Sequence, residues 1–245
     1  MQRFGWPEGL TLPLSVGHRG ASAHDTENTL RCFQQAARLG AQMWELDTQL
    51  TSDGICVVSH DDHLLRVFGI DAHISRMTAA ELMALPGAEV PTFADVAALA
   101  RDLGCGLYVE IKAAGSGPAA WRELERNRQR FAALGSFRID MVRELREAGC
   151  PYPLSVLVPL GADPHEAAAT VDADIIHPCW ERAGERPQDL LTADFFARAQ
   201  RDGREILLWH EERRPIIADL IRLPVLGICS DMPELIRDAA IRAAT

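Results

Sequence analysis

The chain has 245 residues, of which 47% are hydrophobic and 24% are charged, and its formal net charge at pH 7 is −10. This is the composition of an ordinary globular protein, and its acidic balance argues against general affinity for nucleic acid or anionic membranes, which bind basic surfaces. No stretch approaches the roughly 18 uninterrupted apolar residues of a membrane span, and the first residues lack the pattern of a secretory signal.

A repeated unit of helix and strand runs along the chain. An alanine-rich helical stretch ends at a glycine and an apolar strand follows within a few residues, as in "ALARDLGCGLYVEI" and "ARAQRDGREILLW". Glycine fits the left-handed position just after a helix, and this alternation predicts parallel strands joined by helical crossovers. Nine strands are predicted, at residues 14–18, 42–47, 55–60, 106–112, 131–137, 153–159, 173–178, 205–209 and 226–230.

A closed (β/α)8 TIM barrel needs only eight strands, and a hairpin accounts for the ninth. Only the tripeptide "SDG" separates the second and third predicted strands, so they are predicted to form a hairpin about Asp53-Gly54, a favoured two-residue turn. Counting back from that turn pairs Asp47 with His60. The fold predicted from these elements is therefore an α/β barrel.

An open doubly wound sheet is the alternative. It would need a glycine-rich phosphate loop after its first strand, and "GHRGAS" matches neither of the usual loops. No linker-like tract divides the chain, so residues 1–245 are predicted to form one domain. The stretch 61–91 interrupts the alternation, with Thr78 and Glu81 at capping-box spacing, and is predicted to be a short insertion at the C-terminal mouth of the barrel.

Six cysteines are scattered along the chain without a C-x-x-C pair. This pattern favours reduced thiols over zinc ligands or a disulfide framework. Together with the absence of a span or signal, it predicts a cytoplasmic protein. The sequence leaves a monomer and a homodimer both open.

Polar side chains gather where the predicted strands end, which is where strand-helix barrels carry their active sites. Because side chains alternate along a strand, the carboxylates two residues apart in "ELD" share one face. Buried carboxylates are costly unless a positive charge meets them. The polar strand-end residues are His18, Arg19, Glu45, Asp47, His60, Asp61, Glu110, Lys112, Ser230 and Asp231.

A divalent cation would supply the missing positive charge. Three carboxylates with neutral oxygens suit a hard ion such as Mg²⁺ or Ca²⁺. The three carboxylates and two basic side chains at these strand ends carry a formal charge of −1. A divalent ion changes it to +1, which attracts a phosphodiester monoanion. Two histidines near neutral pKa could then act as acid and base at phosphorus.

Each of these residues also has a simpler interpretation. The two carboxylates of "ELD" could form salt bridges to Arg19 or Lys112, and Trp209 could be a core residue. His177 and His210 are interpreted as hydrogen-bonded structural residues. Glu27 and Asn28 could mark only the start of the first helix. It is the co-occurrence of polar residues at several strand ends that favours an active site.

The stretches "GHRGASAHDTENTL" and "ELDTQLTSDGICVVSHDD" resemble the opening of the glycerophosphodiester phosphodiesterase family. Its signatures are a histidine-arginine-glycine, a P-E-N-T helix start, an E-x-D strand, a T-x-D-G turn and a terminal histidine-aspartate. The likeness continues through "LYVEIK", the strand that ends in Trp209 and "GICSDMP", and so covers roughly residues 15 to 238.

The resemblance implies a (β/α)8 barrel with the insertion 61–91 beside its active site. It also implies metal-dependent hydrolysis of a small-molecule glycerophosphodiester to sn-glycerol 3-phosphate and an alcohol. The family is similar to the phosphatidylinositol phospholipases C, which implies that the glycerol 2-hydroxyl attacks phosphorus first. The implied site comprises the metal ligands Glu45, Asp47 and Glu110, the acid-base pair His18 and His60, the phosphate-binding Arg19 and Lys112, and the pocket residue Trp209.

Two departures from the family pattern stand out. Thr26 replaces the proline before E-N-T, which changes little because proline there mainly presets a helix start. After Trp209 the family continues with threonine, a small apolar residue and asparagine, whereas this chain has "HEER". The second departure leaves the identity of the alcohol open. A phosphodiesterase for a lysophospholipid or another diester is the alternative function, and a non-catalytic binder is a further one.

Overall fold

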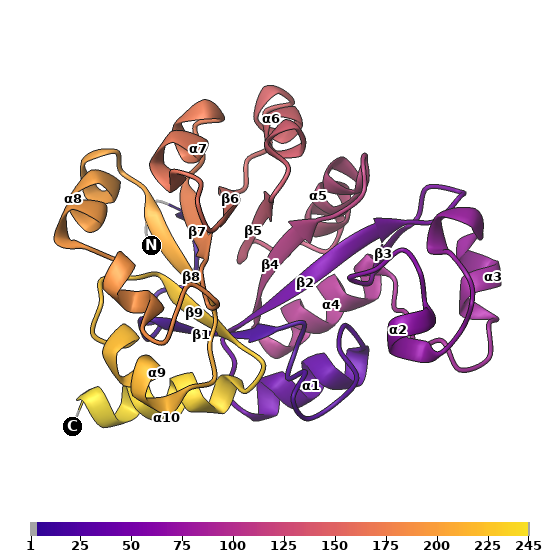
Figure 1. Ribbon diagram of the computed structural model, residues 1–245. Coiled ribbons are helices and arrows are strands. Elements are labelled where there is room, and N and C mark those ends of the chain that lie inside the picture. Colours follow the sequence, from indigo (N-terminus) through magenta and orange to yellow (C-terminus); the bar gives the residue numbers. More distant parts are fainter. Residues whose placement is uncertain (1–3, 245) are drawn as a thin grey trace.

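A closed barrel of parallel strands forms the centre of the molecule, shown in Figure 1 as a computed structural model that describes residues 4–244. The strand order is β1-β9-β8-β7-β6-β5-β4-β2-β3, and an additional β1–β2 pairing closes the sheet. All neighbours pair in parallel except β2 and β3. The (β/α)8 prediction is confirmed, with all nine predicted strands present. Their bounds are β1 Leu14–His18, β2 Met43–Leu50, β3 Cys56–Val58, β4 Gly106–Ile111, β5 Ala132–Ser136, β6 Leu154–Pro159, β7 Ile175–Cys179, β8 Glu205–His210 and β9 Gly227–Ser230.

Helices alternate with the parallel strands and surround the barrel (Figure 1). Among the described residues, no helix is long and apolar enough to cross a membrane. The α-helices are α1 Leu30–Arg38, α2 Leu65–Phe68, α3 Ala79–Met83, α4 Phe93–Leu103, α5 Ser116–Arg126, α6 Ile139–Glu147, α7 Pro164–Thr170, α8 Ala193–Arg201, α9 Arg214–Leu220 and α10 Pro233–Ala244, and the short 3-10 turns are η2 Ile74–Arg76 and η3 Pro187–Leu190.

Two layers of apolar side chains hold the barrel together. One fills its interior and includes Leu14, Met43 and Tyr108. The larger one packs the outer faces of the strands against the helices and includes Trp44 and Phe93. Because side chains alternate between the two layers along each strand, a polar residue near a strand's C-terminal end is directed either to the barrel mouth or to a helix.

The β2–β3 hairpin is present, but its predicted register is wrong by one residue. Thr48 pairs with Val58, and the amide of Ser59 donates to the carbonyl of Asp47. The loop has three residues rather than two. Gly54 takes a positive φ of 79°, as three-residue hairpin loops require. His60 consequently lies one residue beyond the partner of Asp47.

The insertion 61–91 contains α2, η2 and α3 and extends beyond β3, to the right in Figure 1. Its own small cluster of buried side chains includes Leu64, Ile74 and Leu82. The capping box predicted at Thr78 and Glu81 is formed. A short helix that could not bury its apolar face alone is thus held by a local core.

The turn after β1 leaves no space for a side chain at Gly17. A Cβ there would lie 2.5 Å from the carbonyl oxygen of Gly20 and 3.3 Å from the Cβ of Ala36. This close approach brings His18 and Arg19 to the barrel mouth, and Arg19 takes a positive φ of 54°.

We therefore expect Gly17→Ala to lower the free energy of unfolding by roughly 1–3 kcal/mol, the usual range for overpacking. Urea unfolding of the two proteins measures this difference. Gly184→Ala is the matched control, because a Cβ at Gly184 meets nothing within 4 Å. Equal effects of the two substitutions would contradict the close-approach argument.

Candidate active site

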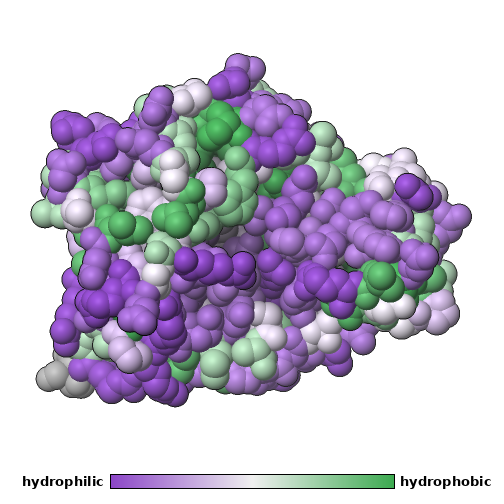
Figure 2. All heavy atoms as spheres, viewed as in Figure 1, coloured by the Kyte–Doolittle hydropathy of each residue, from purple (hydrophilic) through white to green (hydrophobic). Residues whose placement is uncertain are grey.

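A cavity of about 210 Å³ opens at the C-terminal ends of the strands. Figure 2 shows mainly hydrophilic residues around a central hollow on the face of the molecule in view. Seven of the eight predicted site residues border the cavity, and the eighth, Asp47, is fully buried. The seven are His18, Arg19, Glu45, His60, Glu110, Lys112 and Trp209.

Three carboxylates converge beside this cavity. Glu45 and Asp47 lie on β2, and Glu110 of β4 pairs in register with Asp47. Each offers a carboxylate oxygen within 4.8 Å of the others, and all three side chains are buried. The Oδ1 atom of Asp47 is buried and has no hydrogen-bond partner among the described residues. An all-oxygen set with an unsatisfied oxygen fits a hard divalent cation.

Burial and mutual repulsion raise the pKa values of two of the three carboxylates. Burial raises the pKa of Glu45, and the charges of Asp47 and Glu110 raise it further. Burial, together with the charge of Asp47, raises the pKa of Glu110 to about 7. Burial acts the same way on Asp47, but Arg19 and Lys112 outweigh it and leave its pKa lowered. A bound cation would relieve this repulsion.

Both predicted basic residues contact the carboxylate group. Arg19 Nε lies 3.3 Å from Asp47 Oδ2. Lys112 Nζ lies 3.0 Å from Glu110 Oε1 and 3.6 Å from Asp47 Oδ1. The salt bridges of the simpler interpretation are therefore present. They do not exclude an active site, because both side chains also border the cavity.

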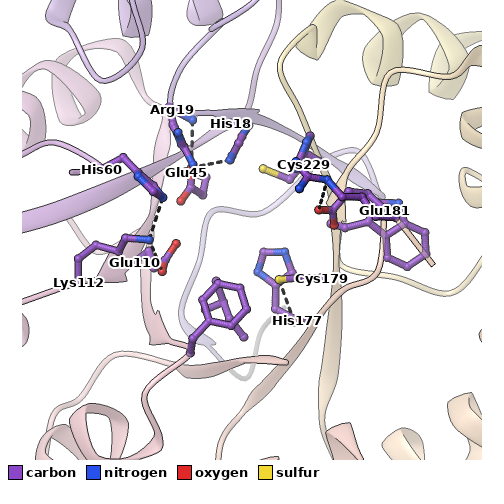
Figure 3. Close-up of a pocket in the computed structure, with 15 residues that line it drawn as sticks. His18, Arg19, Glu45, His60, Glu110, Lys112, His177, Cys179, Glu181 and Cys229 are labelled. Atoms are coloured by element: carbon purple, nitrogen blue, oxygen red, sulfur yellow. Dashed lines mark hydrogen bonds and ion pairs between the residues drawn. The ribbon is translucent and has the colours of Figure 1, made fainter. Parts of the chain in front are cut away.

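The two predicted histidines are each held by a carboxylate through Nδ1. His18 Nδ1 lies 2.6 Å from Asp231 Oδ1, and His60 Nδ1 lies 2.7 Å from Asp61 Oδ1. Because a carboxylate accepts the Nδ1 proton, Nε2 of each ring is left to accept one. The Nζ atom of Lys112 lies 3.0 Å from Nε2 of His60 (Figure 3).

The pKa values of His18 and its partner Asp231 are both lowered, but by different causes. Burial lowers the pKa of His18, and the hydrogen bond to Asp231 only partly opposes this. Burial would raise the pKa of Asp231, but the hydrogen bond and the charge of His18 bring it to about 2. Asp231 is thus a fixed anion beside an imidazole that favours its neutral form.

The two histidines interpreted as structural differ from each other. His177 Nδ1 bonds the hydroxyl of Tyr108 at 2.9 Å, and burial lowers its pKa to about 3, so it is hydrogen-bonded as predicted, and it also borders the cavity. His210 instead stacks on His18 with ring centroids 4.6 Å apart and an interplanar angle of 5°.

A second group of potential metal ligands comprises His18, His210 and Asp231. The nitrogen lone pairs of an imidazole lie in the plane of its ring, and the planes of these two stacked rings are nearly parallel, so the lone pairs do not converge on one ion. The Nδ1 atom of His18 is also already bonded to Asp231. The carboxylate group on β2 and β4 is the better metal site.

The comparisons with known proteins agree with this geometry. The model of the Glycerophosphoryl diester phosphodiesterase family matches residues 18–235. The chain belongs to this family. It is accordingly a hydrolase of the phosphodiesterase class, as the sequence resemblance predicted, and the metal-binding tendency of the family agrees with the buried carboxylate group.

Three family relatives illustrate the range of similarity. A glycerophosphodiester phosphodiesterase from Caldanaerobacter subterraneus is 26% identical over 241 residues, 90% of this chain and 95% of the relative. A human lysophospholipase D is 42% identical over 71 residues, 29% of this chain and 23% of the human protein. The fold matches an Oleispira antarctica phosphodiesterase, solved in complex with the product sn-glycerol-3-phosphate, with a TM-score of 0.77 at 22% identity, covering 91% of this chain and 95% of that one.

Some residues of this phosphodiesterase site were not assigned from the sequence. Asn28 is buried and donates to Asp47 Oδ2 at 2.9 Å, and Glu27 bonds Arg19 at 3.0 Å. Their interpretation as no more than a helix start is wrong, since Thr29 caps α1. The E-N-T motif was the signal that could have placed them at the site.

Other site residues had no such signal. Asp231 was recognised as a strand-end residue but without a role, and His210 lies in the stretch that departs from the family pattern. In the same stretch, Glu212 Oε1 accepts from the amide of Asp231 at 2.8 Å and from Ser230 Oγ at 3.2 Å. Glu212 thereby holds the segment that orients His18. Trp209 borders the cavity but is nearly fully buried and packs in the outer core.

Proposed function

We propose that this protein is a metal-dependent enzyme that hydrolyses glycerophosphodiesters to sn-glycerol 3-phosphate and an alcohol. The observation that carries the proposal is the meeting of one carboxylate group, two carboxylate-held histidines and two basic side chains at the mouth of a barrel of this family. Such an activity would belong to glycerol and lipid metabolism. A cytoplasmic location, a single catalytic domain over residues 1–245 and the choice between monomer and homodimer stay predictions from the sequence.

In the proposed site, Glu45, Asp47 and Glu110 hold one divalent cation, Mg²⁺ or Ca²⁺. When bound, the ion supplies positive charge that polarises the phosphate and orients the attacking hydroxyl. The unsatisfied Oδ1 atom of Asp47 and the raised pKa values of its two neighbours support this assignment.

His18 and His60 are the proposed acid-base pair, and Arg19 and Lys112 bind the phosphate. His18 fits the base, because burial lowers the pKa of its ring and Asp231 fixes the tautomer with a lone pair on Nε2. The attacking group is the glycerol 2-hydroxyl, as the resemblance to the phosphatidylinositol phospholipases C implies. Its proton passes to Nε2 of His18, and the alcohol leaves with a proton from His60 in its protonated form. Water then opens the resulting cyclic phosphate to sn-glycerol 3-phosphate, and Trp209 forms part of the pocket wall.

Release of sn-glycerol 3-phosphate from a panel of soluble glycerophosphodiesters tests the proposal. We expect release in the presence of Mg²⁺ or Ca²⁺ and loss of release with a chelator, because the phosphate site has surplus negative charge without the ion. Re-addition of each metal should restore turnover and identify the preferred ion. Undiminished release in excess chelator would refute metal dependence, and no release from any ester would refute the activity.

A lysophospholipid is the second candidate substrate. A groove of about 460 Å³ lies between α1 and the insertion, where Leu30, Met83 and Val90 contribute apolar surface that an acyl chain could cover. The partial match to a human lysophospholipase D points the same way. Including a lysophospholipid in the panel separates the two candidates by their relative kcat/KM.

A further inference from the structure

Two hollows meet at the phosphate site. The cavity of about 210 Å³ and a groove of about 700 Å³ over the insertion share His60 and Lys112. A phosphodiester has two arms, so one arm can lie in each hollow. The glycerol arm is small and common to all substrates of the proposed reaction, whereas the alcohol varies. The smaller cavity therefore suits glycerol, and the larger groove suits the alcohol.

The side of the cavity that would take the glycerol arm comes from the strands β5 to β8 and the segments after them. Figure 3 shows Cys179, His177 and Glu181 across the cavity from His60 and Lys112. Most of this wall is neutral or aromatic at pH 7. Glu181 is different, because its carboxylate is negatively charged and cannot pair with the phosphate, which is also an anion.

The carboxylate of Glu181 lacks a close partner. Its Oε2 atom is buried and makes no hydrogen bond among the described residues. Its Oε1 atom lies 3.8 Å from Nε of Arg182, too long for a hydrogen bond, and the side chain of Arg182 is 89% exposed. Glu181 borders the cavity, and its side chain is 21% exposed. A ligand donor in the cavity can therefore meet a carboxylate oxygen.

The backbone that carries Glu181 is held by residues 210–213, the "HEER" stretch that departs from the family pattern. Arg213 donates to the carbonyl oxygens of Glu181 at 3.1 Å and of Gly184 at 3.3 Å. The buried Glu211 in turn holds Arg213, with Nε at 2.8 Å from its Oε1 atom. Glu181 thus sits on a fixed loop rather than a free one, as a specificity residue requires.

We propose that Glu181 recognises the glycerol arm by accepting a hydrogen bond from its terminal C1 hydroxyl. A substrate acylated at C1 lacks that donor and would leave the carboxylate unpaired, so the enzyme would favour deacylated glycerophosphodiesters over 1-acyl lysophospholipids. This inference rests on the proposed function and assigns its substrate class. The step itself is binding only, so no bond is made or broken at Glu181.

A double-mutant-style cycle, in which two substrates are each tested with the wild type and with Glu181→Leu, tests the inference. The substrates are glycerophosphoethanolamine and the analogue in which the C1 hydroxymethyl group is a methyl group, with released ethanolamine as the common readout. The wild type should favour the glycerol ester in kcat/KM by roughly 10–100-fold, the range for a hydrogen bond to a charged group. Glu181→Leu should remove that preference, so that the variant cleaves the two esters with similar kcat/KM.

Two further variants sharpen the cycle. Glu181→Gln keeps an oxygen acceptor and should retain part of the preference. Glu185→Leu removes an exposed carboxylate from the same loop, outside the cavity lining, and should retain all of it. Circular dichroism of Glu181→Leu checks that the variant is folded.

The possible failures can be told apart. Equal kcat/KM for both esters in the wild type, or a preference that survives Glu181→Leu, would overturn the inference and leave the proposed function standing. A short-chain 1-acyl lysophosphatidylethanolamine cleaved better than the deacylated ester would also overturn it. No ethanolamine from any ester would instead remove the proposed function on which the inference rests.

Discussion

Replacing His18 or His60 by alanine is expected to lower kcat by roughly 10²- to 10⁴-fold, the usual range for a positioned acid or base. Each ring is held through Nδ1 by a carboxylate, so Nε2 is the atom left to exchange protons. In His60 this atom also lies 3.0 Å from Lys112 Nζ, a proposed phosphate ligand. Asp231→Asn should cause a smaller loss and shift the pH–rate profile, because the amide no longer fixes the tautomer of His18. Steady-state kinetics across pH measure all three effects.

The control for these variants is His24→Ala. His24 lies outside the cavity lining and bonds Glu234 at 2.8 Å, and its removal should leave kcat within about twofold of wild type. Circular dichroism of each variant checks that the barrel is intact. Full activity in both the His18 and His60 variants would show that the acid-base assignment is wrong.

Glu110→Gln is expected to make the metal-free protein more stable above pH 7, by roughly 1–3 kcal/mol. Burial raises the pKa of Glu110 to about 7 in the folded state, well above its value in an unfolded chain. Between about pH 4.5 and pH 7 the folded state binds the additional proton, so this residue's contribution to stability falls as pH rises. Glu110→Gln has no carboxylate to ionise, so it does not lose this stability as pH rises.

Added Mg²⁺ or Ca²⁺ should make the wild type more stable than Glu110→Gln. A bound ion stabilises the folded state in proportion to its affinity, and the variant has lost a proposed ligand. Urea unfolding at pH 4.5 and pH 8, with chelator and with saturating metal, measures both effects. Glu144→Gln on the exposed face of α6 is the matched control. It should change neither the stability of the metal-free protein nor the stabilisation by added metal. A metal-free Glu110→Gln protein less stable than wild type at pH 8 would argue against surplus charge in the carboxylate group.

The barrel was predictable because strands and helices alternate with clear signals. Apolar strands after helix-ending glycines located all nine strands to within a few residues. The hairpin register was wrong because Gly54 allows a three-residue loop as readily as a two-residue turn, and one residue changes every pairing. Register is set by the local dihedral angles of the loop, which the alternation of side chains does not specify.

The site was predictable where strand ends and family motifs coincide, as at Glu45 and Glu110. It was not predictable where contacts join distant segments with no shared motif. Asp231 lies 213 positions from His18 in the sequence, and His210 reaches the same ring by stacking. The unpaired oxygen of Glu181 depends on the path of a loop held by Arg213. Such contacts follow from three-dimensional packing rather than from local pattern.

The insertion is joined to the carboxylate group by a continuous series of ion pairs. Arg66 of α2 bonds Glu27 at 2.6 Å, Glu27 bonds Arg19 at 3.0 Å, and Arg19 Nε lies 3.3 Å from Asp47. We therefore expect the docking of the insertion to be coupled to the charge at Asp47. If a cation bound to the carboxylate group changes how tightly the insertion is held, thermodynamic reciprocity requires that docking of the insertion change the affinity for that cation by the same factor.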